Sequence, residues 1–267
     1  MRSELLCILL VLGSSTPILG QQLKAITNSL GTKLVLIHAG SFSMGSPEGE
    51  TGRQGDEPLH EETFGKSFYL GVYETTQDEF EKVMGNNPSR FRGPKNPVEH
   101  LSWEVAVLYC DKLSQLPEEK AAGRAYRLPT ESEWEYACRA NSTTSYFAGE
   151  TEDELATYAW FSENSGMRSH PVGEKAANRW GLYDMHGNVW EWCQDVYKRL
   201  PTDETSDPQG KMAGTSRVFR GGSYKHEGIY CRSAFRIKEF PSYRHDHIGF
   251  RVALTLPAKQ SESVPSE

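Results

Sequence analysis

The segment RVFRGGSYKHEGIYCRSAFR, which runs from Arg217 to Arg236, carries the most informative pattern in the chain. It opens with the strand-like run Arg217–Gly221 and continues into a Gly-Gly-Ser turn, where the missing glycine side chains let another backbone approach closely. A single cysteine, Cys231, follows His226 by five residues. A serine, a histidine and a thiol therefore lie close together along one short segment, which makes it the first candidate for a functional site.

Six further stretches occur along the chain in a fixed order. They are GSFSMGS (Gly40–Ser46), YETTQDEF (Tyr73–Phe80), NPVEHLSW (Asn96–Trp103), YRLPTESEWEYACRA (Tyr126–Ala140), GLYDMHGNVWEWCQD (Gly181–Asp195) and IGFRVAL (Ile248–Leu254). Together with the segment above, they resemble the formylglycine-generating enzymes, or sulfatase-modifying factors, in their short bacterial form. Because the order is kept over most of the chain, chance is a poor explanation for the resemblance.

The resemblance implies a fold and an activity. The fold would be an α+β, irregular and loop-rich variant of the C-type-lectin fold, with few short helices and strands, over residues 34–256. The activity would be the oxygen-dependent oxidation of a cysteine in an extended peptide, such as one from a sulfatase, to formylglycine. In the family two cysteines at this spacing hold copper. Here His226 occupies the first of these positions and Cys231 the second.

Three interpretations of Cys231 remain open from the sequence. It is a small buried residue, a disulfide partner, or a Cu⁺ ligand paired with the nitrogen of His226. The resemblance further implies that Ser223 orients oxygen or substrate and that Trp190 and Tyr230 line the cleft. The alternative is a turn that ends a strand, flanked by two core aromatic residues.

A structural calcium site is implied by the family motif within Gly181–Asp195. Its ligands would be the side chains of Asp184 and Glu191 and the carbonyl oxygens of Gly187 and Val189, which are the hard oxygen donors that Ca²⁺ prefers. Without the resemblance, a polar turn in which Asp184 bonds its own backbone explains the same residues.

The sequence His245-Asp246-His247 also invites a metal interpretation. Alternate residues of an extended chain share a face, so both imidazoles could reach one ion. Since no third ligand is identifiable from the sequence, a solvated polar loop is the preferred interpretation.

Composition and the two ends of the chain bound the setting. Residues 1–20 have the pattern of an export signal, with an apolar run too short to span a bilayer, and residues 257–267 that of a disordered tail. An exported (periplasmic or secreted) protein without stable membrane insertion is therefore expected. The net charge is -7, and the basic residues are not concentrated in any one stretch, which disfavours nucleic acid as a partner. Cys7 lies within the predicted signal. The disulfide pairing of the four remaining cysteines, Cys110, Cys138, Cys193 and Cys231, stays open.

Local signals predict three helices and four strands. Helices should begin after Thr76 and Thr130, each with a capping box, and after Ser102, while residues 21–33 form a short lead-in. The helix that begins after Thr130 should bury one face, formed by Trp134, Ala137 and Cys138. The expected strands are Leu34–Ile37, Ser67–Tyr73, Arg217–Gly221 and Gly249–Leu254.

Two functions compete at this point. The first is an exported cysteine oxidase of the formylglycine-generating type with an altered copper site at Cys231. The second is a non-catalytic module of the same fold, whose loops calcium fastens and whose groove holds a peptide, a glycan or a partner protein. The oligomeric state is left open by the sequence.

Overall fold

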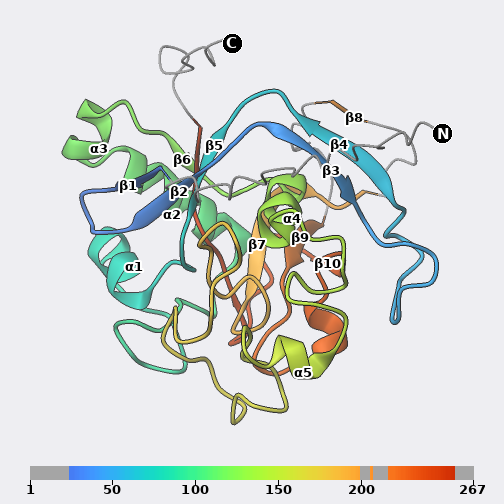
Figure 1. The fold of residues 1–267 in the computed structure, drawn as a ribbon. Helices are drawn as coiled ribbons and strands as arrows, with labels where there is room; N and C mark the ends of the chain where they lie inside the picture. The colour runs from blue at the N-terminus through green and yellow to red at the C-terminus, as the bar shows by residue number, and fades with distance from the viewer. Residues whose placement is uncertain (1–23, 199–204, 207–215, 256–267) are drawn as a thin grey trace, which may run out of the picture.

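Short elements joined by long loops make up the fold in the computed structural model, which describes residues 24–198, 205–206 and 216–255 (Figure 1). The strands are β1 (Ala25–Thr27), β2 (Lys33–Ile37), β3 (Gly40–Met44), β4 (His60–Phe64), β5 (Phe68–Gly71), β6 (Tyr126–Arg127), β7 (Trp190–Val196), β8 (Thr205–Ser206), β9 (Arg217–Arg220), β10 (Arg236–Glu239), β11 (Ile248–Gly249) and β12 (Ala253–Thr255). The helices are α1 (Gln77–Met84), α2 (Trp103–Ser114), α3 (Pro117–Ala121), α4 (Glu131–Arg139), α5 (Glu152–Leu155) and the 3₁₀ turn η1 (Gly228–Cys231).

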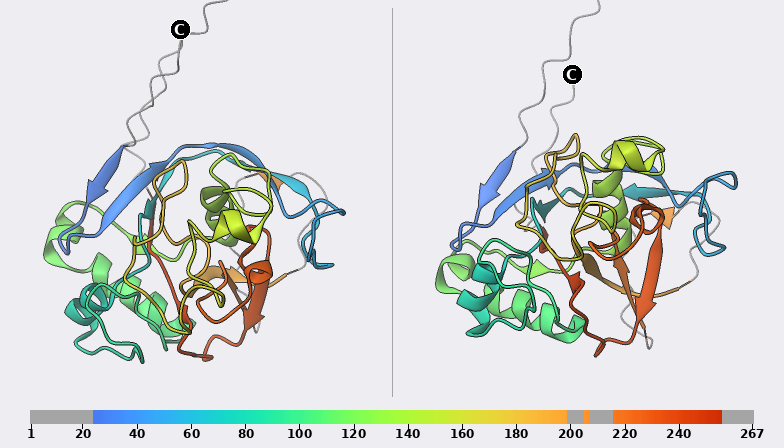
Figure 2. Two further views of the ribbon diagram at one scale, coloured as in Figure 1. Left: turned by 60° about the horizontal axis from the view of Figure 1, so that its bottom comes forward. Right: turned by 90° about the horizontal axis from the view of Figure 1, so that it is seen from below.

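Three small sheets organise these elements. Their strand orders are β1-β2-β5-β12-β6, β10-β9-β7-β11 and β3-β4-β8. The helices α1, α2 and α3 gather on one side, whereas α4 packs against β3, β7 and β9 (Figure 1). The long loops between α4 and β7 gather beside the segment that contains η1, and α5 contacts η1 directly (Figure 2). This α+β, loop-rich arrangement is the one expected from the sequence.

The helix starts follow the local signals. α1 and α4 begin at complete capping boxes, Thr76–Glu79 and Thr130–Glu133, and Ser102 caps α2. α1 ends at Gly85, whose φ of 78° is the left-handed conformation that glycine adopts without strain. The three predicted helices are confirmed because these signals involve only neighbouring residues.

Two predictions about strands need correction. The expected strand Gly249–Leu254 is divided between two sheets: β11 pairs with β7 in parallel, and β12 pairs with β5 and β6. Between them the chain turns Arg251 fully into the interior, where its guanidinium binds Glu191. The lead-in at residues 21–33 also contains β1, which pairs with β2. Residues 1–20 and 257–267, with the predicted signal and tail, lie outside the described residues.

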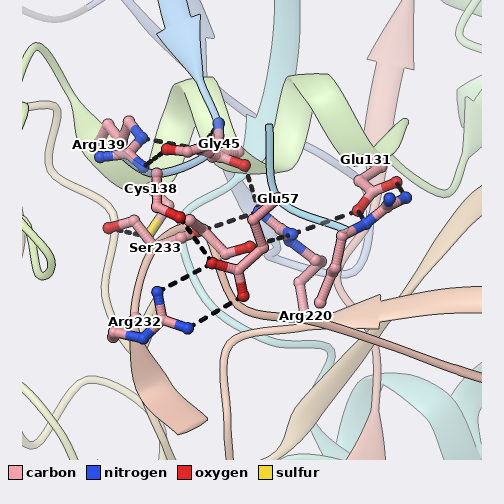
Figure 3. A network of polar contacts seen from close by, with 12 residues as sticks. Gly45, Glu57, Glu131, Cys138, Arg139, Arg220, Arg232 and Ser233 are labelled. Atoms are coloured by element: carbon pink, nitrogen blue, oxygen red, sulfur yellow. Dashed lines mark hydrogen bonds and ion pairs between the residues drawn. The ribbon is translucent and has the colours of Figure 1, made fainter. Parts of the chain in front are cut away.

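Burial of α4 exceeds the expected single face. All nine residues from Glu131 to Arg139 are buried, including the carboxylates of the polar face. Arg220 and Arg236 bind Glu131, and Arg220 also binds Glu135, which pairs in turn with Arg139 (Figure 3). Because arginines from β9 and β10 neutralise these carboxylates, the polar face of the helix is buried as completely as the apolar one.

The cysteines of the described region are free. Cys110, Cys138, Cys193 and Cys231 are all buried and none forms a disulfide. Of the alternatives left open for Cys231, the structure therefore shows a thiol and not half of a disulfide. Among the helices of the described region, none has the length and apolar character needed to cross a bilayer.

Glu99 is a buried carboxylate that should make stability depend on pH. One oxygen accepts the backbone N–H groups of Arg90 and Phe91 at 2.6 and 2.8 Å, while the other is buried without a hydrogen-bond partner. Burial raises the pKa of Glu99 to about 7. A raised folded-state pKa stabilises the fold at low pH, and this stability is lost as pH rises through that value.

We therefore expect the wild type to lose about 1 kcal/mol of unfolding free energy relative to Glu99→Gln between pH 6 and pH 8. Urea unfolding at both pH values measures this difference. The exposed control Glu81→Gln should follow the wild type, and a wild type that gains stability relative to Glu99→Gln over this interval would refute the assignment.

Candidate functional site

The turn after β9 positions the candidate site. Gly221 and Gly222 have φ of 100° and 78°, in the left-handed region that favours glycine. A Cβ placed on Gly222 would lie 2.4 Å from the Cys231 sulfur, so only a glycine lets that side chain pack here. The turn therefore holds Ser223 on one side and the sulfur of Cys231 against its backbone.

Cys231 itself is sealed. Its exposure is 0%, and it packs in a small apolar cluster with Tyr146, Leu155 and Phe161. Burial raises the pKa of the Cys231 thiol far above its ordinary value. The sulfur is consequently a protonated, enclosed thiol, whereas both nucleophilic attack and Cu⁺ binding require the thiolate.

His226 makes a different set of contacts. Its Nδ1 lies 2.7 Å from the Ser223 hydroxyl and 3.2 Å from Trp190 Nε1. Because the Trp190 indole N–H can only donate, Nδ1 is an acceptor and the proton of the neutral ring resides on Nε2. Burial, reinforced by the charges of Lys225 and His245, lowers the pKa of His226 to about 4. The ring is thus neutral at physiological pH, and its Nδ1 is already hydrogen-bonded to Ser223 and Trp190.

The structure therefore joins four of the five predicted site residues. Trp190, Ser223 and His226 form one hydrogen-bonded group, and Tyr230 packs on the His226 ring at a centroid distance of 5.7 Å. Trp190 and Ser223 are 1% and 0% exposed, so this group is accessible only through His226 and Tyr230. The sulfur of Cys231 packs into the apolar cluster behind the turn.

Two of the predicted calcium ligands, Asp184 and Glu191, lie in a second, buried group. Asp184 accepts the Gly173 N–H through Oδ2 at 2.7 Å, while its Oδ1 is buried without a hydrogen-bond partner. Glu191 accepts two hydrogen bonds from Arg251 and one, at 2.9 Å, from the Trp134 indole. Since a carboxylate offers about four lone-pair positions, Glu191 keeps acceptor capacity.

Glu74 and Arg251 complete this group, and the sequence did not single them out. Glu74 accepts the backbone N–H of Val189 at 3.0 Å and the side-chain amide of Asn188 at 2.7 Å. Both Glu74 and Arg251 lie within the stretches that resemble the family, and this resemblance is the sequence signal that could have identified them. Only the fold brings them near Asp184. Arg251 pairs with Glu191, and its charge also acts on Glu74 and Asp184, so three carboxylates lie near one buried guanidinium.

This excess of negative charge contributes to the raised pKa values of Glu74 and Asp184. Burial, with repulsion from Asp184 and Glu191, raises the pKa of Glu74 well above its ordinary value. Burial likewise raises the pKa of Asp184 to about 6. An unpartnered carboxylate oxygen and uncompensated negative charge suit a hard cation, so the residues present fit Ca²⁺ on donor chemistry.

The stretch His245–His247 differs from the expected solvated loop. Asp246 is only 6% exposed, because Arg90 binds one of its oxygens and the Tyr224 hydroxyl donates to its carbonyl at 3.2 Å. The His247 ring lies 5.1 Å from the His226 ring, so this segment borders the candidate site.

The small sheets, sparse helices and long packed loops define an α+β fold of the C-type-lectin kind. The chain belongs to the sulfatase-modifying factor enzyme 1-like domain family, which matches residues 21–256. It is 29% identical to the formylglycine-generating enzyme of Mus musculus over 290 residues, covering 83% of this chain and 75% of the mouse protein.

Two solved structures are similar over nearly the whole fold. Treponema denticola variable protein 1 superposes with a TM-score of 0.76 and 30% identity, covering 90% of this chain and 100% of that one. PvdO from Pseudomonas aeruginosa also gives a TM-score of 0.76 at 30% identity, covering 88% of this chain and 100% of that one. The family and the fold class predicted from the sequence are thereby confirmed.

Proposed function

We propose that this protein is a non-catalytic binding member of its family, which holds an extended peptide or protein segment at the surface formed by Tyr230 and His226. One observation carries the proposal: the sulfur of Cys231 is fully enclosed, and this burial raises the pKa of its thiol. A copper-dependent cysteine oxidase of this family would need an accessible thiolate pair there, and His226 occupies the other position with its Nδ1 bound to Ser223 and Trp190.

The exposed aromatic surface suits a peptide. Tyr230 is 38% exposed and packs on the rings of His226 and Phe235, at 5.7 and 5.2 Å. A tyrosine held in this way offers an apolar face and a hydroxyl with little rotational entropy to lose, as is common in protein interfaces. Ser223 and Trp190 beneath it keep the His226 ring in one orientation.

Catalysis and binding can be tested separately. Protein loaded with Cu⁺ is incubated with a Cys-x-Pro-x-Arg peptide and oxygen, and the peptide mass is followed. We expect no conversion by the wild type, and none by His226→Cys while Cys231 stays enclosed. Conversion by the wild type would overturn the proposal.

Binding is measured with peptides selected from a random display library. Tyr230→Ala should weaken their binding by about 10-fold or more, whereas Leu108→Ala, at a somewhat more exposed apolar residue on α2, should not. If both variants bind the peptides as the wild type does, the Tyr230 surface is not the binding site.

A calcium ion held by Asp184 and Glu191 is the second part of the proposal, supported by the unpartnered Asp184 Oδ1. It would fasten the loop before β7 and neutralise the carboxylates around Glu74. We expect saturating Ca²⁺, at about 100 times its Kd, to add about 2.7 kcal/mol to the unfolding free energy. Chemical unfolding with and without a chelator measures this gain.

Asp184→Asn should abolish the calcium-dependent gain, and the exposed control Asp78→Asn should keep it. A wild type that unfolds identically with Ca²⁺ and with the chelator would show that the buried carboxylates do without the ion.

A further inference from the structure

Two imidazoles and a carboxylate converge immediately before β11. The rings of His245 and His247 lie 4.1 Å apart between centroids, with Asp246 between them in sequence. One ligand atom of each residue lies within 4.8 Å of the other two. The missing third ligand of the sequence pattern is therefore Asp246, the residue between the two histidines.

The three converging atoms are left open by the rest of the protein. His245 Nδ1, Asp246 Oδ1 and His247 Nδ1 are each shielded from solvent and have no hydrogen-bond partner among the described residues. The two nitrogens lie 2.7 and 3.5 Å from Asp246 Oδ1, but their orientation does not make hydrogen bonds. Buried polar atoms are rarely left without a partner, and three at one point indicate a shared missing partner.

The surrounding residues hold this group in place. Arg90 binds the other oxygen of Asp246, whose side chain is 7% exposed. The backbone carbonyl of His247 accepts a hydrogen bond from the backbone N–H of Trp190 at 2.9 Å. The backbone carbonyl of His245 accepts one from the backbone N–H of His100 at 3.1 Å. Partners that fix the ligands in this way are typical of metal sites, where they orient the donor atoms.

We propose that His245 Nδ1, Asp246 Oδ1 and His247 Nδ1 bind one divalent transition-metal ion of the Zn²⁺ type. Two imidazole nitrogens with one carboxylate oxygen suit Zn²⁺, Cu²⁺, Fe²⁺ or Ni²⁺, whereas Ca²⁺ and Mg²⁺ prefer oxygen alone and Cu⁺ prefers thiolate. This site is distinct from the predicted calcium group, and it does not depend on the proposed peptide binding.

Three protein ligands leave a coordination position for an exchangeable group. A surface hollow lined by Pro88, Arg90, His100, His245 and Asp246 lies beside the ligands. On the other side, the His226 ring lies 5.1 Å from His247, so the ion borders the Tyr230–His226 surface. A metal-bound water or a side chain of a bound partner would occupy the open position.

The test uses the full-length protein without a polyhistidine tag, in excess Ca²⁺ so that oxygen sites are filled. Zn²⁺ is titrated by calorimetry, and the zinc that remains after desalting is counted by mass spectrometry. We expect one zinc per chain. His245→Ala and His247→Ala should each lower the affinity at least about 100-fold. The matched control His38→Ala removes an exposed imidazole and should bind as the wild type does.

A spectroscopic measurement separates this site from adventitious binding. Cu²⁺ bound to the wild type should show electron paramagnetic resonance couplings to two nitrogens, reduced to one in His245→Ala. Circular dichroism confirms that each variant is folded. The proposal is overturned if the folded wild type retains no zinc, or if the folded His245→Ala and His247→Ala proteins both bind it with wild-type affinity.

Discussion

Replacing Arg220 by methionine should lower the free energy of unfolding by about 3–5 kcal/mol. Arg220 is fully buried and binds the carboxylates of Glu131 and Glu135 on α4 (Figure 3). It also donates to the backbone carbonyls of Ser233 and Ala234, at 2.7 and 2.9 Å, which anchors the segment after Cys231. Methionine fills a similar volume but leaves the Glu135 charge with Arg139 alone and removes both carbonyl contacts.

Urea unfolding followed by tryptophan fluorescence measures this loss. The control is Lys82→Met, which removes an ion pair with Asp78 whose side chains are 49% and 51% exposed. Such exposed pairs contribute about 0.3–0.5 kcal/mol on a helix. If Arg220→Met and Lys82→Met cost the same, the buried pairs do not hold α4 against the sheet.

Gly222→Ala should cost about 3 kcal/mol, the second largest effect expected here. The new methyl group would lie 2.4 Å from the sulfur and 2.9 Å from the Cα of Cys231, which is closer than real contacts allow. The φ of 78° adds the strain that any side chain meets in the left-handed region. Relief would require moving either the turn or the 3₁₀ segment η1.

Gly85→Ala is the matched control, because Gly85 has the same φ of 78° but no atom within 4 Å of the position that a new methyl group would take. Its cost should be about 1–2 kcal/mol, from backbone strain alone. In the Gly222→Ala background, Cys231→Ala removes the sulfur and should recover part of the loss. Equal costs at Gly222 and Gly85 would show that the sulfur does not pack on the turn.

The sequence predicted the features that depend on neighbouring residues or on the resemblance. Capping boxes such as Thr130–Glu133 are local, so the helix starts were correct. The burial of the polar face of α4 was missed because Arg220 and Arg236, which neutralise it, lie about a third of the chain away. The division of Gly249–Leu254 was missed because one apolar run serves two sheets.

The candidate site was also predicted only in part, because some of its contacts join residues that are distant in sequence. The resemblance named Trp190, Ser223 and His226, which the fold brings together. Nothing local indicated that Cys231 would face an apolar cluster built from the distant loop between α4 and β7. Likewise, the contacts that accompany the burial of Asp246 come from Arg90 and Tyr224, which lie far away in sequence.

The accessibility of the Cys231 sulfur in the native protein tests the account most directly. Native protein is exposed to iodoacetamide at pH 8, and modification of each cysteine is followed by peptide mass spectrometry. We predict that Cys231 reacts at least about 1,000-fold more slowly than in the denatured chain, and no faster than Cys110, which is buried in α2. Rapid modification of Cys231 while Cys110 remains protected would contradict the account, because it would reveal a reachable thiolate beside His226.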